Sequence, residues 1–283
     1  MTSGPLAHNH LASPLETSRP FMHITQLRNA TVVLGFESAG QAVNLLIDPM
    51  LAPRAALPTL KWLTRTRRRN PLVDLPSQAD SVLGSVTHAL ITHCQRGHFD
   101  HLDRAGKHFL RERRIPVFCT PHDEPYLRAR GLEARPLGAL NRAPFFHGHI
   151  TAIPCVHGLG WVGRLMEHGV GYFIELPGEP SLYIAGDTLL TDAVRACVTQ
   201  HQPDLVIVPA GGARFDTGGD ILMNGEDALE LTRVAPGRVI ANHLEALDHC
   251  PTTREGLRAA ARHAGLADRL LVPDDGEQYH FAA

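Results

Sequence analysis

The strongest constraint on the fold of this 283-residue chain is a recurring pattern of short apolar runs, each followed by a histidine or an aspartate. The run at 182–186 precedes Asp187, and the run at 238–242 precedes His243. Short runs of this kind predict buried strands. Because open α/β sheets present their strand ends side by side, and ligands collect there, the pattern predicts an α/β protein with a polar site at one sheet edge.

A second regularity is that the same local plan occurs twice. Two β-rich runs within 31–48 are separated by Ser-Ala-Gly, and two within 171–187 are separated by Pro-Gly-Glu-Pro, both of which are turn signals. Each pair ends in an aspartate, at Asp48 and at Asp187. The repetition predicts two similar halves of α/β type. Helix-like stretches alternate with further strand-like runs, at 102–114, 123–131, 190–201, 225–234 and 253–265.

Two segments depart from this alternation. Residues 1–20 are rich in Pro, Ser, His and Asn, and they predict a loose N-terminal tail. Residues 21–283 are then expected to form a single domain. Within it, 53–80 contains four prolines and predicts an irregular insertion, or a flap over one face.

Composition excludes several classes of function. Lys and Arg number 27 against 29 Asp and Glu, and this net charge of −2 argues against a protein that binds nucleic acid or a membrane surface. No secretory signal is visible, and no apolar run reaches the roughly 18 residues of a membrane span. Five dispersed cysteines without a CxxC spacing indicate reduced thiols. We therefore expect a cytoplasmic protein that acts on a small molecule, with a homo-oligomer left open.

The densest cluster of metal-ligating side chains is Thr-His-Cys-Gln-Arg-Gly-His-Phe-Asp-His-Leu-Asp at 92–103, which holds His93, His98, Asp100 and His101. The chain has 18 histidines, and histidine is the commonest metal ligand. Imidazole and carboxylate groups together suit one or two divalent metals. Further candidates follow strand-like runs elsewhere in the chain, at His157, Asp187 and His243.

The spacing of these residues favours hydrolytic chemistry. Asp100 and His101 are adjacent and point differently, so they can serve one metal while His98 serves another. A carboxylate such as Asp187 can bridge two metals because both of its oxygens have spare lone pairs. Metals about 3.5–4 Å apart can polarise a substrate and lower the pKa of a bound water towards about 7. Such a site needs no protein nucleophile.

Taken together, the His-x-Asp-His, the later lone His, the Gly-Asp-Thr and the final His resemble the metallo-β-lactamase superfamily. The details look most like its branch of cytoplasmic lactonase-like hydrolases, typified by L-ascorbate-6-phosphate lactonase. The resemblance implies a four-layer αββα sandwich of two similar β-α halves, with metals at one edge of the sheets. It extends from Ile24 to Tyr279, through matching segments at 46–50, 92–103, 156–158, 183–188, 223–224 and 242–246.

The resemblance also implies a metal-dependent hydrolase, in which a metal-bound hydroxide attacks a lactone-, ester- or phosphoester-type small substrate. Asp100 would be the catalytic residue that orients the hydroxide. Zinc is the default metal, with manganese or iron as alternatives, and an anionic substrate is left open. His93, His98 and His157 would bind one metal, Asp100, His101 and His243 the second, and Asp187 would bridge them.

One departure from the family pattern concerns the first ligand. The family has His-x-His-x-Asp-His, whereas this chain has four residues between His93 and His98. An alignment without a gap puts Arg96 in the place of the first histidine, and the first metal site would then lose a ligand. We favour a three-residue insertion within 94–97, because Thr-His at a strand end matches and Gly97 makes a bulge easy.

Other interpretations stay open beside this one. A mononuclear iron dioxygenase-like oxidoreductase and a non-catalytic metal-binding protein are the alternatives. The Gly-x-Gly-x-x-Gly at 158–163 matches a dinucleotide-binding motif, but 164–171 leads into a strand pattern where that motif opens a helix. Cys94 is interpreted as a bystander and not as a nucleophile. Three residues are candidates for orienting a ligand or meeting the substrate: Glu245, His249 and Asn224.

Overall fold

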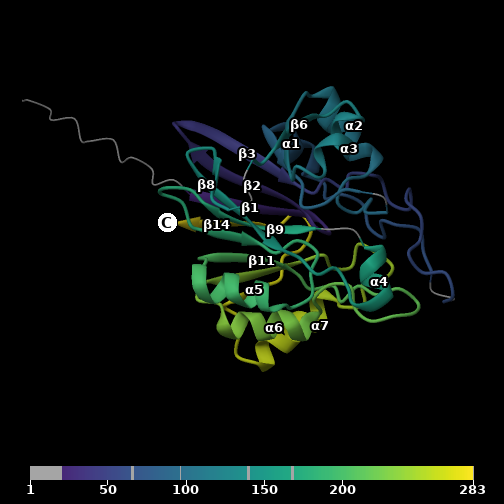
Figure 1. The fold of residues 1–283 in the computed structure, drawn as a ribbon. Helices are drawn as coiled ribbons and strands as arrows, with labels where there is room; N and C mark the ends of the chain where they lie inside the picture. The colour runs from purple at the N-terminus through teal and green to yellow at the C-terminus, as the bar shows by residue number, and fades with distance from the viewer. Residues whose placement is uncertain (1–20, 65–66, 96, 139–140, 167–168, 283) are drawn as a thin grey trace, which may run out of the picture.

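The computed structural model describes residues 21–64, 67–95, 97–138, 141–166 and 169–282. Within them the chain forms two seven-stranded sheets that pack face to face (Figure 1). The first sheet has the strand order β14-β1-β2-β3-β4-β5-β6, and the second has the order β13-β12-β11-β10-β9-β8-β7. The tail predicted at 1–20 lies outside the described residues.

The strands of the first sheet are β1 (Phe21–Arg28), β2 (Thr31–Ser38), β3 (Gln41–Ile47), β4 (His88–Leu90), β5 (Pro116–Cys119), β6 (Glu133–Pro136) and β14 (Gln278–Ala282). Those of the second are β7 (Ala143–Phe145), β8 (Gly148–Pro154), β9 (Val170–Glu175), β10 (Leu182–Ile184), β11 (Leu205–Pro209), β12 (Arg238–Asn242) and β13 (Leu270–Leu271). The helices are α1 (Ala79–Gly84), α2 (Arg104–Glu112), α3 (Glu124–Arg128), α4 (Gly160–Leu165), α5 (Asp192–Ala196), the π-helix η1 (Cys197–His201), α6 (Gly225–Val234) and α7 (Arg254–His263).

The two sheets repeat one topology. In the first, β14, β1, β2 and β3 are antiparallel neighbours, and β3 to β6 are parallel. In the second, β7 to β10 are antiparallel, and β10 to β13 are parallel. The hairpin β2-β3 therefore has its counterpart in β9-β10, and the predicted duplication is confirmed.

Apolar side chains fill three layers between and outside the sheets. Successive residues of β2 point to opposite faces, so Leu34 enters the core between the sheets while Val33 packs outward against α1, α2 and α3. The outer face of the second sheet is covered by α5, η1, α6 and α7. Figure 1 shows these two helical layers on opposite sides of the paired sheets. The αββα sandwich expected from the sequence is confirmed.

The segment 53–78 has no helix or strand among its described residues, apart from an isolated bridge between Leu57 and Asn70. It is anchored to both halves of the molecule. The fully buried Arg28 donates to the carbonyl of Val73, and the Asp248 carboxylate accepts from the Leu60 amide at 3.0 Å. These contacts hold the segment across the loop that follows β12. Its role as a flap stays a prediction.

One expectation about local structure is wrong. The helix α4 begins at Gly160, inside the Gly-x-Gly-x-x-Gly motif at 158–163, where we expected no helix to open. The motif still lacks the context of a dinucleotide site, because β8 and β9 on either side of it are antiparallel neighbours and form no β-α-β unit. In the part of the chain that the structure describes, no helix has the length and apolar character needed to cross a bilayer.

Candidate metal centre

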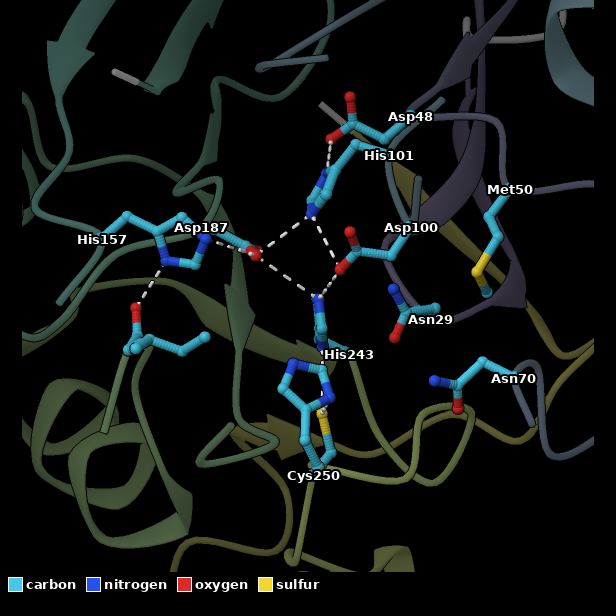
Figure 2. A network of polar contacts seen from close by, with 12 residues as sticks. Asn29, Asp48, Met50, Asn70, Asp100, His101, His157, Asp187, His243 and Cys250 are labelled. Carbon is cyan, nitrogen blue, oxygen red and sulfur yellow. Dashed lines mark hydrogen bonds and ion pairs between the residues drawn. The ribbon is translucent and has the colours of Figure 1, made fainter. Parts of the chain in front are cut away.

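Strand ends from both sheets bring polar side chains to one edge of the sandwich. Asp48 directly follows β3, and His93 comes shortly after β4 in the first sheet. In the second sheet, Asp187 follows β10 and His243 directly follows β12. Figure 2 shows the side chains of Asp187 and His243 pointing at those of the turn that contains Asp100. The edge position that the apolar runs predicted is where these side chains meet.

The predicted ligands form two groups of buried side chains. Within each group, the candidate ligand atoms lie within 4.8 Å of one another. The first group contains three imidazoles, and the second contains two imidazoles and two carboxylates, so each group could hold a cation. The first group is His93, His98 and His157, and the second is Asp100, His101, Asp187 and His243.

The Asp187 carboxylate lies between the two groups. Its Oδ2 is 3.1 Å from His101 Nε2 and 3.5 Å from His243 Nε2, both in the second group. The same oxygen is 3.7 Å from His157 Nε2, which belongs to the first group. The second carboxylate that faces His243 Nε2 is that of Asp100, whose Oδ2 lies 3.3 Å from it. Asp187 therefore has both the position and the lone pairs to join two cations.

Several imidazole nitrogens of the site are buried without a hydrogen-bond partner among the described residues. They are Nε2 of His93 and both ring nitrogens of His98, whereas Nε2 of His101 and Nε2 of His243 face carboxylate oxygens at 3.1 Å and 3.3 Å. Leaving one buried polar group unpaired costs about 1–3 kcal/mol, so such atoms are rare in native proteins. A divalent cation in each group would satisfy these nitrogens together. The residues present therefore fit a metal centre.

The imidazoles of the first group are held neutral. Burial lowers the pKa of His98 to about 4, and burial together with neighbouring imidazoles lowers the pKa of His93 well below its usual value. Burial also lowers the pKa of His157. A neutral imidazole keeps a lone pair on its ring nitrogen, which is the form that binds metal.

The second group has the opposite electrostatics. Burial alone would lower the pKa of His101, but the carboxylates of Asp187, Asp48 and Asp100 outweigh burial and raise it well above its usual value. Burial would raise the pKa of Asp100, yet His101 and His243 outweigh it and lower that pKa. Ionised carboxylates therefore face these imidazoles. A bound cation would take the place of the imidazole protons.

Each of three candidate ligands is held by a contact to its other ring nitrogen. His101 Nδ1 is 2.9 Å from Asp48 Oδ2, and His157 Nδ1 donates to the Ile221 carbonyl at 2.7 Å. His243 Nδ1 lies 3.5 Å from the Sγ of Cys250. Contacts of this kind fix the tautomer and the orientation of metal-binding histidines.

The backbone is strained where two of these residues leave their strands. Asp48 has φ of 46° and His243 has φ of 58°, which is the left-handed region that residues other than glycine seldom adopt. The strain is held by neighbouring contacts: the His243 amide donates to the Asn29 carbonyl at 3.0 Å. Backbone strain of about 1–3 kcal/mol per residue tends to collect at functional sites.

The remaining sequence candidates lie further out. His249 is buried, and its Nδ1 lies 3.8 Å from Cys250 Sγ, so it approaches the site through that thiol. Glu245 instead pairs with Arg254 at 2.9 Å. Asn224 caps α6 in a capping box. Arg96, the alternative to His93 as the first ligand position, lies outside the described residues, whereas His93 stands in the first group.

Sequence reasoning missed the residues that hold the ligands. Asp48 accepts from the amide and the hydroxyl of Thr92, at 2.9 and 2.6 Å, as well as facing His101. The sequence does contain a signal for Asp48, because Asp48 follows the first hairpin as Asp187 follows the second. Cys250 had no such signal. Burial would raise the pKa of its thiol, but His249 and His243 lower it to about 7.

The chain is similar to proteins of known sequence along nearly its whole length, although no protein-family model matches it. It is 33% identical over 264 residues to the UPF0173 protein YddR of Bacillus subtilis strain 168, covering 92% of this chain and 100% of the relative. It is 28% identical over 267 residues to a UPF0173 metal-dependent hydrolase of Azorhizobium caulinodans, covering 91% and 99%.

Two solved structures extend the comparison. The crystal structure of isothiocyanate hydrolase from Delia radicum gut bacteria superposes with a TM-score of 0.82 and 31% identity, covering 93% of this chain and 100% of that one. The metallo-β-lactamase fold protein YhfI from Bacillus subtilis superposes with a TM-score of 0.60 and 14% identity, covering 92% and 99%. The second likeness concerns the fold alone, and it identifies the two-sheet sandwich as a metallo-β-lactamase fold.

Proposed function

The chain belongs to the UPF0173 family of metal-dependent hydrolases, and from this premise we propose that it hydrolyses isothiocyanates at a centre of two divalent metals. The observation that carries the proposal is the pair of buried ligand groups with the Asp187 carboxylate between them. The substrate class is supported by the isothiocyanate hydrolase that resembles this chain over its full length. No lactonase appears among the relatives named above.

The proposed reaction adds water to an isothiocyanate, R–N=C=S. A C–O bond forms at the central carbon while the π electron pair of the C=N bond moves onto nitrogen, which takes a proton. The thiocarbamic acid so formed, R–NH–C(=S)–OH, transfers its O–H proton to nitrogen, the C–N bond breaks, and the products are the amine R–NH2 and carbonyl sulfide. No oxidant or reductant is required.

The roles of the residues follow from their places in the site. His93, His98 and His157 would hold one metal, and Asp100, His101 and His243 the other, with Asp187 shared. A divalent cation, when bound, polarises substrate and brings the pKa of water from 15.7 down to about 7.

Asp100 orients the attacking water. Burial would raise the pKa of this carboxyl, but the imidazoles of His101 and His243 outweigh burial and lower it, so the group stays ionised and accepts a hydrogen bond. Its Oδ2 already faces His243 Nε2 at 3.3 Å, beside the Asp187 carboxylate. No side chain of the protein is needed as a nucleophile, and Cys94 is buried.

Zinc is the metal we propose, because a set of five imidazoles and two carboxylates suits it, with manganese and iron as the alternatives. The five free thiols suit a reducing compartment, so we place the reaction in the cytoplasm. An apolar cavity beside the centre has no Lys or Arg among the described residues that line it, which favours a neutral substrate over an anionic one.

The proposal is tested by measuring metal content and turnover on the same preparation. Zinc-loaded protein is expected to release amine from isothiocyanates faster than it opens lactones or cleaves carboxylic esters and phosphodiesters. His98→Ala is expected to lose both metal and turnover. Faster turnover of a lactone, an ester or a phosphodiester would overturn the substrate class. Iron with oxygen consumption would favour the dioxygenase alternative, and metal without any turnover would favour a non-catalytic protein.

A further inference from the structure

Exposed apolar side chains of this protein are concentrated near the metal centre. Six of the seven large apolar side chains that the described residues leave exposed come from two segments, 62–63 and 156–165. Trp62 is 58% exposed and Trp161 is 60% exposed. Single exposed apolar residues are ordinary, but a contiguous group of them marks a binding surface. The six residues are Trp62, Leu63, Val156, Leu159, Trp161 and Leu165.

Four of these residues line a cavity of about 440 Å³, which we call the apolar pocket. Its volume lies within the roughly 300–1,000 Å³ that is usual for small-molecule sites. Both tryptophans of the chain take part in it. Apolar groups dominate the lining, with Asp216 and Thr217 as the polar members. The full lining is Trp62, Leu63, Trp161, Leu165, Met166, Phe215, Asp216 and Thr217.

The wall of the apolar pocket packs against residues that hold the metal ligands. Its residues Met166 and Phe215 pack in one apolar cluster with Ile221 and Cys250. The Ile221 carbonyl accepts from His157 Nδ1 at 2.7 Å, and Cys250 Sγ lies 3.5 Å from His243 Nδ1. Residues that pack directly behind the pocket wall, Ile221 and Cys250, therefore contact a candidate ligand of each group.

Aromatic rings form one wall of the apolar pocket. The rings of Trp62 and Phe215 are stacked, with their centroids 6.2 Å apart and an interplanar angle of 27°. Phe215 is stacked in turn on His249, at 6.0 Å and 24°. This ladder runs from the exposed Trp62 inward to His249, which touches Cys250. Aromatic pairs favour offset-stacked arrangements at such separations, so a further ring can join the wall.

The wall is held in place by the polar members of the loop. One carboxylate oxygen of Asp216 accepts from the backbone amides of Trp62 and Leu63, at 2.5 and 2.9 Å. Lys61 Nζ donates to the Phe215 carbonyl at 3.1 Å. The charged groups of Lys61 and Asp216 therefore hold segment 61–63 against segment 215–216. What the pocket offers to a ligand is its apolar and aromatic surface.

We propose that the apolar pocket binds the aromatic side chain of an arylalkyl isothiocyanate, and so sets which isothiocyanates this hydrolase prefers. The inference rests on the proposed function, because the pocket is placed to receive the group R while the N=C=S carbon lies at the metal centre. Burial of an aromatic ring against Trp62, Trp161 and Phe215 supplies the binding energy. A methyl group in the place of R leaves that surface uncovered.

The first test compares two substrates, 2-phenylethyl and methyl isothiocyanate, on zinc-loaded protein. In Leu165→Ala and Trp161→Ala, the ratio of kcat/KM for the aromatic to the methyl substrate is expected to fall about tenfold or more, through a higher KM for the aromatic one. Both side chains are largely exposed, so folding is little affected. Val234→Ala, an exposed residue of α6, is the matched control and is expected to keep the ratio. An unchanged ratio in both pocket variants overturns the proposal.

The second test does not depend on hydrolysis. Because both tryptophans line the pocket, their fluorescence reports on it directly. 2-Phenylethylamine, the amine product, is expected to change the emission saturably, and methylamine is not. Leu165→Ala retains both tryptophans and is expected to bind the aromatic amine about tenfold more weakly.

The outcomes separate the pocket from the proposed function. Saturable binding that depends on Leu165, without hydrolysis of any isothiocyanate, retains an aryl-binding pocket and overturns the proposed function. Hydrolysis with an unchanged substrate ratio and no change in emission overturns the pocket alone. A dimer in sedimentation that Trp161→Glu dissociates makes this surface a contact between copies of the chain, and it also overturns the pocket.

Discussion

Asp48→Asn is a substitution whose effect follows from three contacts. Asp48 Oδ1 accepts from the Thr92 amide at 2.9 Å, and Oδ2 accepts from the Thr92 hydroxyl at 2.6 Å while facing His101 Nδ1 at 2.9 Å. The carboxylate is an acceptor only, so it holds a proton on Nδ1 of His101. Nε2 of His101 is then free to face the second metal group.

Asparagine keeps the shape of Asp48 and changes this pattern. Its amide oxygen replaces Oδ1 and still accepts from the Thr92 amide. Its NH2 group replaces Oδ2, so it no longer accepts from the Thr92 hydroxyl and donates towards His101 Nδ1. The imidazole proton then moves to Nε2, and that nitrogen can no longer bind metal. Losing such an outer partner typically weakens metal affinity about 10–100-fold, or about 1.4–2.7 kcal/mol. We expect a loss of this size for zinc.

The assay is a competition titration of zinc between the metal-free protein and a chromophoric chelator. Asp103→Asn is the matched control, because Asp103 is also buried and accepts from two backbone amides, those of Gly106 and Ala52. It caps α2 and contacts no candidate ligand in the hydrogen bonds described, so its substitution is expected to lower the Tm and leave zinc affinity unchanged. Wild-type affinity in Asp48→Asn, or an equal loss in Asp103→Asn, would refute the tautomer argument.

Further predictions address the thiol, the metal and a buried carboxyl. Cys250→Ala is expected to weaken zinc binding about tenfold and Cys250→Ser less so, because serine can still contact His243 Nδ1; equal affinities in a chelator competition would contradict this. Removing zinc by dialysis against a chelator is expected to lower the free energy of unfolding by about 2.7 kcal/mol for each metal lost, relative to protein at 100 times the Kd, and an unchanged Tm would contradict metal binding. Burial raises the pKa of Asp275 to about 6 despite Arg254, so the folded state binds the extra proton. Its contribution to stability is full below about pH 4 and is lost as the pH rises through about 6, by roughly 3 kcal/mol. Asp275→Asn is expected to flatten urea-measured stability over that window, and an equally steep slope would count against the assignment.

The fold and the candidate ligands could be predicted because their signals are local. The run before Asp187 and the run before His243 each mark a strand that ends at the site, and parallel neighbours place those ends together. The helix predicted at 225–234 coincides with α6, because the capping box of Asn224 marks where the helix begins. The predictions of a metal-dependent hydrolase and of its fold family are confirmed by the relatives.

What the sequence missed depends on contacts between distant segments. The six-residue helices α1 and α4 are too short to show a helical period in the sequence. Whether such short segments become helical depends on their packing in the folded chain. The contact between Cys250 and His243 joins two turns of one loop whose backbone is strained at His243. The apolar pocket joins 62–63, 161–166 and 215–217, which only the folded chain brings together.

The central claim is that the two groups of buried side chains, joined by Asp187, hold two divalent metals. Anomalous X-ray scattering from zinc-loaded crystals, recorded at the zinc absorption edge, tests this most directly. We predict two peaks, one among His93, His98 and His157 and one among Asp100, His101 and His243, with the Asp187 carboxylate between them. Zinc bound elsewhere, or neither group occupied in saturated crystals, would contradict it.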